Sequence, residues 1–450
     1  FYLLYVSWNL RRAGNLFIFS FNHCIVKDHI KFLIIFFLSV SQVLLLIAAI
    51  NWWIDPYGIF HPDEYNPKKP IWMSKQLRLA KAYKLKQLKP KGIVMGTSSS
   101  QLGIDPNHPG WDKNIATRYN LGLPGANPYE ILRYFQHSQA VNPPTQILIG
   151  LDFVVFNLFF PLSDDFNESH MVVPQEGNSK DHLYNNFSVT LLSLSAFKAS
   201  QKKLFYRGKG THYSNGRIIP EEKFGESRNN RLALMNSATN FVPKLLMPPP
   251  RHQFCLYDEM GSNYNFLYLR KILKIAKENG ADVRLFIQPT HVYLLEVLRI
   301  LGMTEDYKNW RKELINLVED VNSKYSESEA FPLWDFGGYN SITMTEVPPA
   351  KESHRSILWY WDIGHYNKNL GDLIQDRIFG FKQIKRIVPE DFGTQINSKN
   401  IDQHHSTQET KQKKYTQTYP KDIKELTKRV NAIKKNIRPF DCNQLVTAIQ

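Results

Sequence analysis

Residues 91–106 read KGIVMGTSSSQLGIDP, and the interpretation of the whole chain starts from this stretch. A short apolar run, GIVM, ends at Gly96 and is followed by three consecutive serines at positions 98–100. Small hydroxyl residues after a strand commonly form turns, because their side chains bond their own backbone. The same arrangement also suits a serine nucleophile held at the end of a strand. The nucleophile interpretation requires a base and an oxyanion site elsewhere in the chain, and without them the serines are best explained as a turn.

Apolar runs and helix-like segments alternate along the chain outward from this strand. Further apolar runs occur at 146–156 and 281–289, and helical patterns occur at 127–139, 262–279, 305–324 and 366–379. This alternation predicts an α/β domain with a mostly parallel sheet and helices on both faces. Residues from about 160 to 260 are polar and loop-rich, with one helical stretch near 187–201, and we expect an insertion or lid there.

The composition indicates a globular core and a basic surface. The chain has 450 residues, 43% of them hydrophobic, and a net charge of +15. A basic chain favours anionic neighbours, but there is no zinc-finger spacing, RNP-type motif or helix-turn-helix signal, so we do not expect nucleic-acid binding. Cys24, Cys255 and Cys442 are far apart, odd in number and not in metal-ligand spacing. We therefore expect no disulfide framework and no metal site. We also expect no cofactor.

Residues 32–50, FLIIFFLSVSQVLLLIAAI, contain no charged residue and are followed by Trp52 and Trp53. This length is sufficient for a helix to cross a bilayer, and tryptophans are typical of the membrane interface. A buried core helix is the alternative. No signal-peptide cleavage site is evident, so we expect an uncleaved anchor over residues 32–53.

Positive charges are distributed unequally around this segment. Arg11, Arg12, Lys27 and Lys31 precede it, whereas residues 51–67 contain no Lys or Arg. The positive-inside rule then predicts that the N-terminus is cytoplasmic and that the chain after the anchor lies outside the cytoplasm. We therefore expect a single-pass protein of the bacterial inner membrane, whose main domain is periplasmic or extracellular.

The remaining boundaries follow from composition. We expect a cytoplasmic segment at 1–31, a basic juxtamembrane linker at 54–91, an α/β domain at 92–380 and a polar tail at 381–450. Seven basic residues between 71 and 91 indicate a solvated linker helix, with contact to lipid headgroups or a polyanion as the alternative. The tail is expected to pack poorly, with one helix at 421–436.

Asp362 precedes His365 by three residues in WYWDIGHYNKNLGDLIQDRIFG, residues 359–380. One turn at this spacing can place the carboxylate against one ring nitrogen of the imidazole and leave the other free to take a proton. A helix-capping Asp beside an unrelated His is the alternative. The Asp-x-x-His pair becomes more informative together with Gly96-Thr97-Ser98, NLGLPGA at 120–126 and GLD at 150–152.

In this order, the four segments resemble the four sequence blocks of the SGNH hydrolase superfamily over about residues 92–380. With its N-terminal anchor, the chain is similar to cell-envelope members such as the alginate O-acetylation proteins and the D-alanine transfer protein of teichoic acid synthesis. The resemblance implies a three-layer, flavodoxin-like fold. It also implies that Ser98 is the nucleophile, Asp362 the orienting carboxylate, His365 the general base and Gly122 a backbone donor to the oxyanion. These roles agree with the chemistry that a serine nucleophile requires.

The third block departs from the family pattern. It usually offers an Asn amide to the oxyanion, and Asp152 stands there instead. An ionised carboxylate has no donor and repels an oxyanion. Asn157 replaces that amide only if the chain bends, and a strand-end residue capping a turn is the alternative interpretation of Asp152. His291, just after the strand at 281–289, is a candidate substrate contact, although a His that starts a helix explains it equally well.

The resemblance implies a membrane-anchored esterase or transferase that moves an acyl group through an acyl-serine. We expect this acyl group to be acetyl. Its acceptor would be an envelope polysaccharide or another acyl acceptor, and its donor could be a membrane-embedded protein. A non-catalytic envelope scaffold that binds glycan or a partner protein is the second hypothesis. A lipase is disfavoured, because nothing flanking Ser98 in sequence resembles an acyl-chain groove.

Overall fold

The computed structural model describes residues 29–61, 66, 68–73, 76–173, 188–208, 210–220, 224, 230–434 and 442. The chain divides into two compact units. One, here called the anchor unit, comprises Phe1–Pro56 and Leu183–Tyr206. The other, the α/β unit, comprises Tyr57–His182 and Arg207–Gln450.

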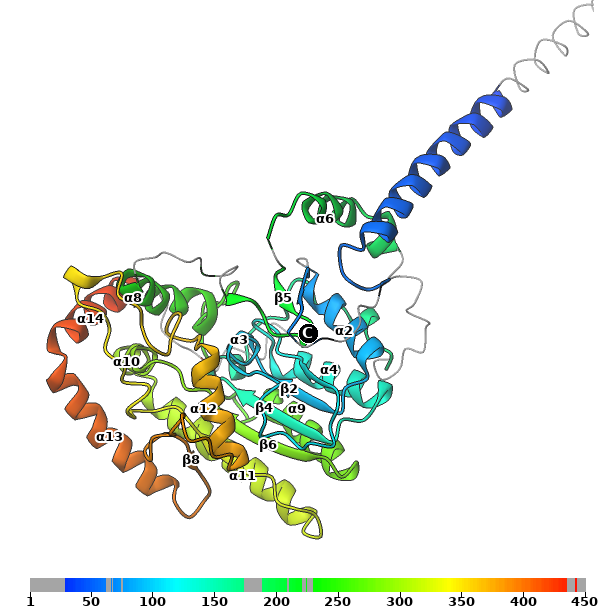
Figure 1. Cartoon of the computed structure of the whole chain (residues 1–450). Coiled ribbons are helices and arrows are strands. Elements are labelled where there is room, and N and C mark those ends of the chain that lie inside the picture. The colour runs from blue at the N-terminus through cyan, green and yellow to red at the C-terminus, as the bar shows by residue number, and fades with distance from the viewer. Residues whose placement is uncertain are drawn as a thin grey trace, which may run out of the picture. The chain divides into compact units, whose positions relative to one another are not determined.

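The α/β unit is built on a six-stranded sheet of order β3-β2-β4-β6-β7-β8. Figure 1 labels β2, β4, β6 and β8 of this sheet. The strands are β2 (Gly92–Met95), β3 (Arg118–Asn120), β4 (Gln146–Leu151), β6 (Asp282–Ile287), β7 (Leu333–Asp335) and β8 (Thr394–Gln395). The first five are parallel, and β8 pairs antiparallel with β7. The prediction of a mostly parallel α/β sheet is confirmed. The apolar run at 146–156 forms a strand only to Leu151 and continues as the 3-10 helix η1 (Phe153–Phe156).

Every residue of β2 and β4 is buried. Since successive side chains of a strand point to opposite faces, both faces of the sheet are covered, as is usual for parallel sheets. On one side α2 (Leu77–Leu88), α4 (Pro128–Val141), α9 (Tyr264–Glu278) and α11 (Thr304–Lys324) contact one another in succession. A separate pair is formed by α3 (Ser98–Gly103) and α12 (Lys368–Phe379). Helices α4, α9, α11 and α12 correspond to the four helical patterns predicted from the sequence.

Capping residues explain where two of these helices begin and end. The Asn127 side chain accepts from the Glu130 amide at the start of α4, and Asn367 accepts from Leu370 at the start of α12. These side-chain acceptors satisfy amides that have no partner within the helix. Helix α12 ends at Gly380, which has a φ of 62° that glycine adopts without a steric penalty.

The basic segment before β2 is not a solvated linker. Helix α2 packs against α4, and its Arg78, Lys81 and Lys84 side chains are buried. The Lys81 ammonium donates to the carbonyl oxygens of Asn120, Gly122 and Gly216 at 2.9, 2.6 and 3.2 Å. The linker prediction is wrong here, because these acceptors come from chain segments that the local pattern does not reveal.

The C-terminal region also differs from the expectation. Helices α13 (Ile401–Thr418) and α14 (Pro420–Lys434) replace the expected poorly packed tail, and Leu426 and Val430 of α14 are fully buried. Helix α14 contacts α10 (Val292–Leu301) and α8 (Asn230–Phe241). The predicted helix at 421–436 corresponds to α14 as far as Lys434, and the rest of that range lies outside the described residues.

The region 160–260 contributes to both units. In the anchor unit, α6 (Leu194–Leu204) follows the π-helix η3 (Ser188–Leu192) and corresponds to the helix predicted near 187–201. In the α/β unit, the region supplies β5 (His212–Tyr213), α8 and the π-helix η4 (Val242–Leu246). Strand β5 pairs antiparallel with β1 (Pro70–Ile71). Further 3-10 turns are η2 (Glu168–His170) and η5 (Ala350–Glu352).

The anchor unit contains the apolar helix His29–Ile54, which is long and apolar enough to cross a membrane. Hydrogen bonds between described residues connect its end to η3 and α6. Asn51 donates to the Leu191 carbonyl at 2.8 Å and accepts from Ser200 at 2.7 Å. Lys203 donates to the Asp55 carbonyl at 2.7 Å. The helix includes the predicted anchor, residues 32–53, and extends beyond it at both ends, by three residues at the start and by one at the end.

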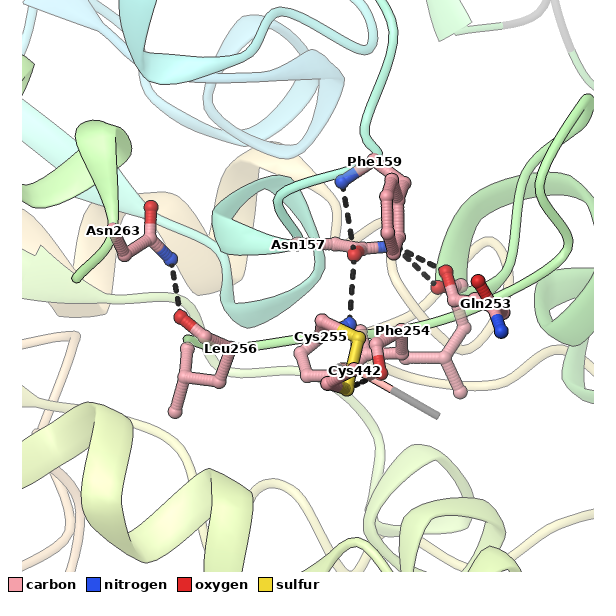
Figure 2. The surroundings of a disulfide bond; sticks show 9 residues. Asn157, Phe159, Gln253, Phe254, Cys255, Leu256, Asn263 and Cys442 are labelled. Carbon is pink, nitrogen blue, oxygen red and sulfur yellow. Dashed lines mark hydrogen bonds between the residues drawn. A yellow bond between two sulfur atoms is a disulfide. The ribbon is translucent and has the colours of Figure 1, made fainter. Parts of the chain in front are cut away.

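Cys255 and Cys442 form a disulfide (Figure 2). The expectation of no disulfide framework is wrong for this pair, whose partners are 187 residues apart in the sequence. Spacing could not reveal it, because the fold brings the two cysteines together.

Candidate active site

The site begins where β2 gives way to α3. Gly96 has a φ of +134°, which L side chains rarely adopt, and a Cβ here would lie 2.5 Å from the Ser100 Oγ and 2.8 Å from the Gly150 carbonyl oxygen. Only glycine fits this turn. Thr97 then caps α3 by accepting from the Ser99 amide, so that Ser98 becomes the first residue of the helix.

The three consecutive serines have different partners. The Ser98 Oγ lies 2.7 Å from the His365 Nε2. The Ser99 hydroxyl donates to the Gly364 carbonyl at 2.8 Å, and the Ser100 hydroxyl accepts from the Gln288 amide at 2.7 Å. Ser99 and Ser100 are buried, whereas Ser98 is partly exposed. Of the three serines, Ser98 is therefore the one that combines access with contact to the imidazole.

Asp362 contacts the other side of the same imidazole. The His365 Nδ1 lies 2.8 Å from each Asp362 carboxylate oxygen. Asp362 Oδ1 also accepts from the amides of Gly364 and His365, both at 2.9 Å, which fixes the carboxylate within its own turn. With Nδ1 donating to Asp362, the Nε2 lone pair faces the Ser98 hydroxyl. The structure thus brings together Ser98, His365 and Asp362, the three residues predicted as catalytic.

Other elements hold this turn in place. The Ile363 amide donates to the Ser237 Oγ of α8 at 3.2 Å, and the His291 amide donates to the Ile363 carbonyl at 2.8 Å. The Tyr366 hydroxyl donates to the Gln288 Oε1 at 2.7 Å. Gln288 therefore links Tyr366, beside the turn, to α3, since its amide also donates to Ser100. Together these contacts hold the Asp362–His365 turn against α3.

Asp152 lies at the end of β4 and lines the same cavity as Ser98. Its Oδ2 accepts from the Thr97 hydroxyl at 2.8 Å. Burial raises the pKa of this carboxyl to about 7, although hydrogen bonds from Thr97 and Gln288 partly oppose the shift. Below that pH the protonated carboxyl can donate a hydrogen bond, and above it the charged form cannot.

A cavity of about 380 Å³ opens beside Ser98. Its polar lining includes Ser98, Asp152, Gln288, Asp362 and His365. The rest of the lining is mainly apolar and comes chiefly from η1, α8, η4, α10 and α11, with single residues from the ends of β4 and β6. The cavity therefore joins a polar end, where the hydroxyl and imidazole meet, to an apolar interior.

The structure does not place Gly122 as an oxyanion donor. Its amide donates to the Asn120 Oδ1 at 2.8 Å, and a Cβ here would lie 2.8 Å from the Gln101 backbone nitrogen. The missing side chain thus allows close packing against α3. Gly122 is buried, whereas Gly125 lines the cavity. The expected role of Gly122 is incompatible with this geometry, because its amide already has an acceptor.

Asn157 is also engaged elsewhere (Figure 2). Its amide nitrogen donates to the carbonyls of Leu246 and Gln253 at 3.1 and 2.8 Å, and its oxygen accepts from the amides of Phe159 and Cys255 at 3.1 and 3.0 Å. This buried side chain connects the end of η1 to the segment that carries Cys255. It has no donor left for an oxyanion.

His291 does not line the cavity around Ser98. It is fully buried at the start of α10, where its Nδ1 accepts from the Tyr293 amide at 3.2 Å and its Nε2 lies 2.9 Å from the Thr345 carbonyl oxygen. Burial lowers the pKa of its imidazole to about 4. The helix-start interpretation describes His291, and the expected substrate contact does not.

Sequence reasoning missed Gln288 and Ser237. Gln288 directly follows β6, and the carboxyl ends of parallel strands commonly carry ligand-contacting residues, so its position was a usable signal. Ser237 gave no such signal, because it lies within a helix that was not predicted. Within the described ranges, no group of three or more His, Cys, Asp or Glu side chains is arranged to hold a metal ion.

No protein-family model matches the chain, and no curated protein sequence matches it.

Proposed function

We propose that this protein is a serine-dependent acyl esterase or O-acyltransferase. The observation that carries the proposal is the continuous contact from Ser98 through His365 to Asp362 at the polar end of a cavity. A serine hydroxyl is a weak nucleophile until a neighbouring base takes its proton. Here that base already contacts the hydroxyl, and a carboxylate orients it.

In the proposed reaction, the Ser98 Oγ attacks the acyl carbonyl while the His365 Nε2 takes the hydroxyl proton. His365 then returns this proton to the leaving alcohol or thiol, which leaves an ester on Ser98. Water or an acceptor hydroxyl attacks that ester, again through His365, and regenerates the serine. The Ser98 amide is a suitable oxyanion donor, because the first amides of a helix have no acceptor within it.

The resemblance to SGNH hydrolases agrees with this proposal. Counted in chain order, the five parallel strands lie in the order 2-1-3-4-5, which is the flavodoxin-like order. The predicted first and fourth sequence blocks contribute Ser98 and the Asp362–His365 pair. A three-layer, flavodoxin-like SGNH fold is therefore part of the proposal.

The proposed location is the outer side of a bacterial inner membrane, with His29–Ile54 as a single-pass anchor. The charges flanking the helix support this orientation. The Cys255–Cys442 disulfide also supports it, because disulfides persist mainly outside the reducing cytoplasm. The proposed acceptor is an envelope polysaccharide, and a membrane-embedded protein is a candidate acyl donor.

A non-catalytic scaffold is the second candidate, and the oxyanion region favours it. Asp152 replaces the expected amide, and the donors of Gly122 and Asn157 are already engaged. Such a scaffold would bind glycan or a partner protein without turnover.

Labelling with a fluorophosphonate, which reacts covalently with activated serines, separates the two candidates. We expect the full-length chain to be labelled, the Ser98→Ala variant to remain unlabelled and the matched Ser99→Ala variant to retain labelling. Absence of labelling in a folded parent protein favours the scaffold. Equal labelling of the parent and Ser98→Ala rules out Ser98 as the reactive residue.

A further inference from the structure

The interior of the cavity beside Ser98 is suited to an apolar ligand. Many of its apolar lining side chains are at least nine-tenths buried, among them Phe153, Ile287, Leu294, Leu298, Tyr307 and Trp310. They come from η1, β6, α10 and α11, which are far from Ser98 in the sequence. The expectation that no acyl-chain groove accompanies Ser98 rested on its flanking sequence, and that sequence does not form these walls.

The exposed side of the cavity includes polar and charged side chains. Asn240, Lys244 and Leu245, at the end of α8 and in η4, line the cavity and are exposed. A ligand entering past these residues can place a carbonyl at Ser98 while its aliphatic part occupies the buried apolar interior. An acetyl group has one methyl to bury and would leave most of this interior unfilled.

The volume sets the size of the group that fits. An apolar cavity of about 150 Å³ can hold a benzene ring, which has six carbons. The cavity beside Ser98 measures about 380 Å³ in total, which on the same scale corresponds to roughly 15 carbons. Because part of this volume belongs to the polar end at Ser98 and to the exposed side, we assign roughly 8 to 12 carbons to the apolar interior.

We propose that the cavity binds an aliphatic acyl chain of about 8–12 carbons, whose carbonyl reacts with Ser98. This inference rests on the proposed function and replaces acetyl as the expected acyl group. The proposed substrate is an activated ester of a medium-chain fatty acid. Ser98 displaces an alcohol or thiol, which takes the proton from His365, and the acyl group is then transferred to water or a hydroxyl.

The first test measures kcat/KM of the full-length chain in lipid nanodiscs with p-nitrophenyl esters from acetyl to dodecanoyl. We expect kcat/KM to rise by up to about fourfold per added methylene as far as octanoyl, because each methylene leaves water. A parallel series of thioesters distinguishes a thioester donor from an oxygen ester. A maximum at acetyl, with a decline as the chain lengthens, overturns the inference and leaves the proposed function standing.

The second test fills the cavity. In Leu294→Trp, the ratio of decanoyl to acetyl turnover should fall at least tenfold, and Leu298→Phe provides a second reading if the first variant does not fold. Leu267→Trp is the matched control, because Leu267 is 55% exposed on α9 and does not line the cavity. An unchanged ratio in both folded cavity variants contradicts the assignment.

A binding measurement separates this inference from the proposed function. Ser98→Ala should bind decanoate in calorimetry and show no measurable binding of acetate at the same concentration. Decanoate binding by a parent protein that shows neither labelling nor turnover overturns the proposed function, and with it the acyl substrate. Failure of decanoate to bind to a protein that turns over acetyl esters overturns only the chain-length inference.

Discussion

The Ser98 Oγ and the His365 Nε2 lie 2.7 Å apart, although the two residues are 267 positions apart in the sequence. Asp362 contacts the opposite ring nitrogen at 2.8 Å. A hydroxyl, an imidazole and a carboxylate in this series form the arrangement that activates a serine for attack on a carbonyl. The first prediction concerns whether the three residues act as one unit.

Substitutions of His365 and Asp362 should not have additive effects. Removing His365 leaves no base for Asp362 to orient, so His365→Ala should lower kcat by about 10³-fold or more. Adding Asp362→Asn to His365→Ala should then change the rate little. Steady-state kinetics of the two single variants and the double variant with one activated ester measure this. Multiplicative effects would show that the two residues act independently.

Asp152 should make turnover depend on pH near neutrality. Its pKa is raised to about 7 by burial, so raising the pH through 7 replaces a neutral carboxyl with a charge that opposes an oxyanion. The rate should therefore fall above pH 7 in the parent. Asp152→Asn should remove that fall and raise the rate at pH 8 by up to about 10²-fold, the typical value of one oxyanion donor. A lower rate in folded Asp152→Asn at pH 8 would show that the carboxylate has a positive role.

The same residue should affect stability in a defined pH window. Because the folded-state pKa of Asp152 lies above that of the unfolded chain, the folded state binds more protons between about pH 4 and 7, and its stability falls as the pH rises through this window. The penalty is complete above pH 7 and amounts to at most about 4 kcal/mol. Asp152→Asn should therefore raise the free energy of unfolding relative to the parent more at pH 8 than at pH 5. Chemical denaturation at the two pH values measures this, and an equal difference at both would contradict the assigned shift.

Arg78 should contribute to the stability of the α/β unit, because it lies on α2, which packs within this unit. Its guanidinium contacts Glu130 at 2.6 Å and Asp165 at 2.8 Å, and the Arg78 and Glu130 side chains are 4% and 0% exposed. Arg78→Met leaves a buried carboxylate unpaired and should cost about 3–5 kcal/mol of unfolding free energy. Lys86→Met on the same helix is the control and should cost less than about 1 kcal/mol, because Lys86 is only partly buried. Equal, small losses in both variants would favour a solvated linker.

The disulfide provides a test of orientation. Cys255 and Cys442 should be joined in protein from intact cells whose free thiols are blocked with an alkylating agent before lysis. Peptide mapping without reduction should recover the linked pair. Alkylation of both cysteines would place the α/β unit in a reducing compartment and contradict the proposed location.

Local patterns in the sequence predicted the elements that depend on near neighbours. The run GIVM followed by Gly96 became β2 and its turn, because strand propensity and a positive φ are properties of a few adjacent residues. The apolar segment at 32–50 became a long exposed helix for the same kind of reason. The three-residue spacing of Asp362 and His365 placed carboxylate and imidazole in contact within one turn.

The sequence by itself therefore determined the mostly parallel α/β sheet, the apolar helix and the position of Ser98 at the end of a strand. Only the tertiary structure decided which donors remain near that serine, because the acceptors that engage Gly122 and Asn157 depend on how separate segments pack. It also decided that Lys81 is buried, since its three carbonyl partners belong to Asn120, Gly122 and Gly216. The apolar cavity also depends on tertiary packing, because its walls come from helices separated from Ser98 by up to about 200 residues. Sequence periodicity shows which face of a helix is apolar, but not which cavity that face will line.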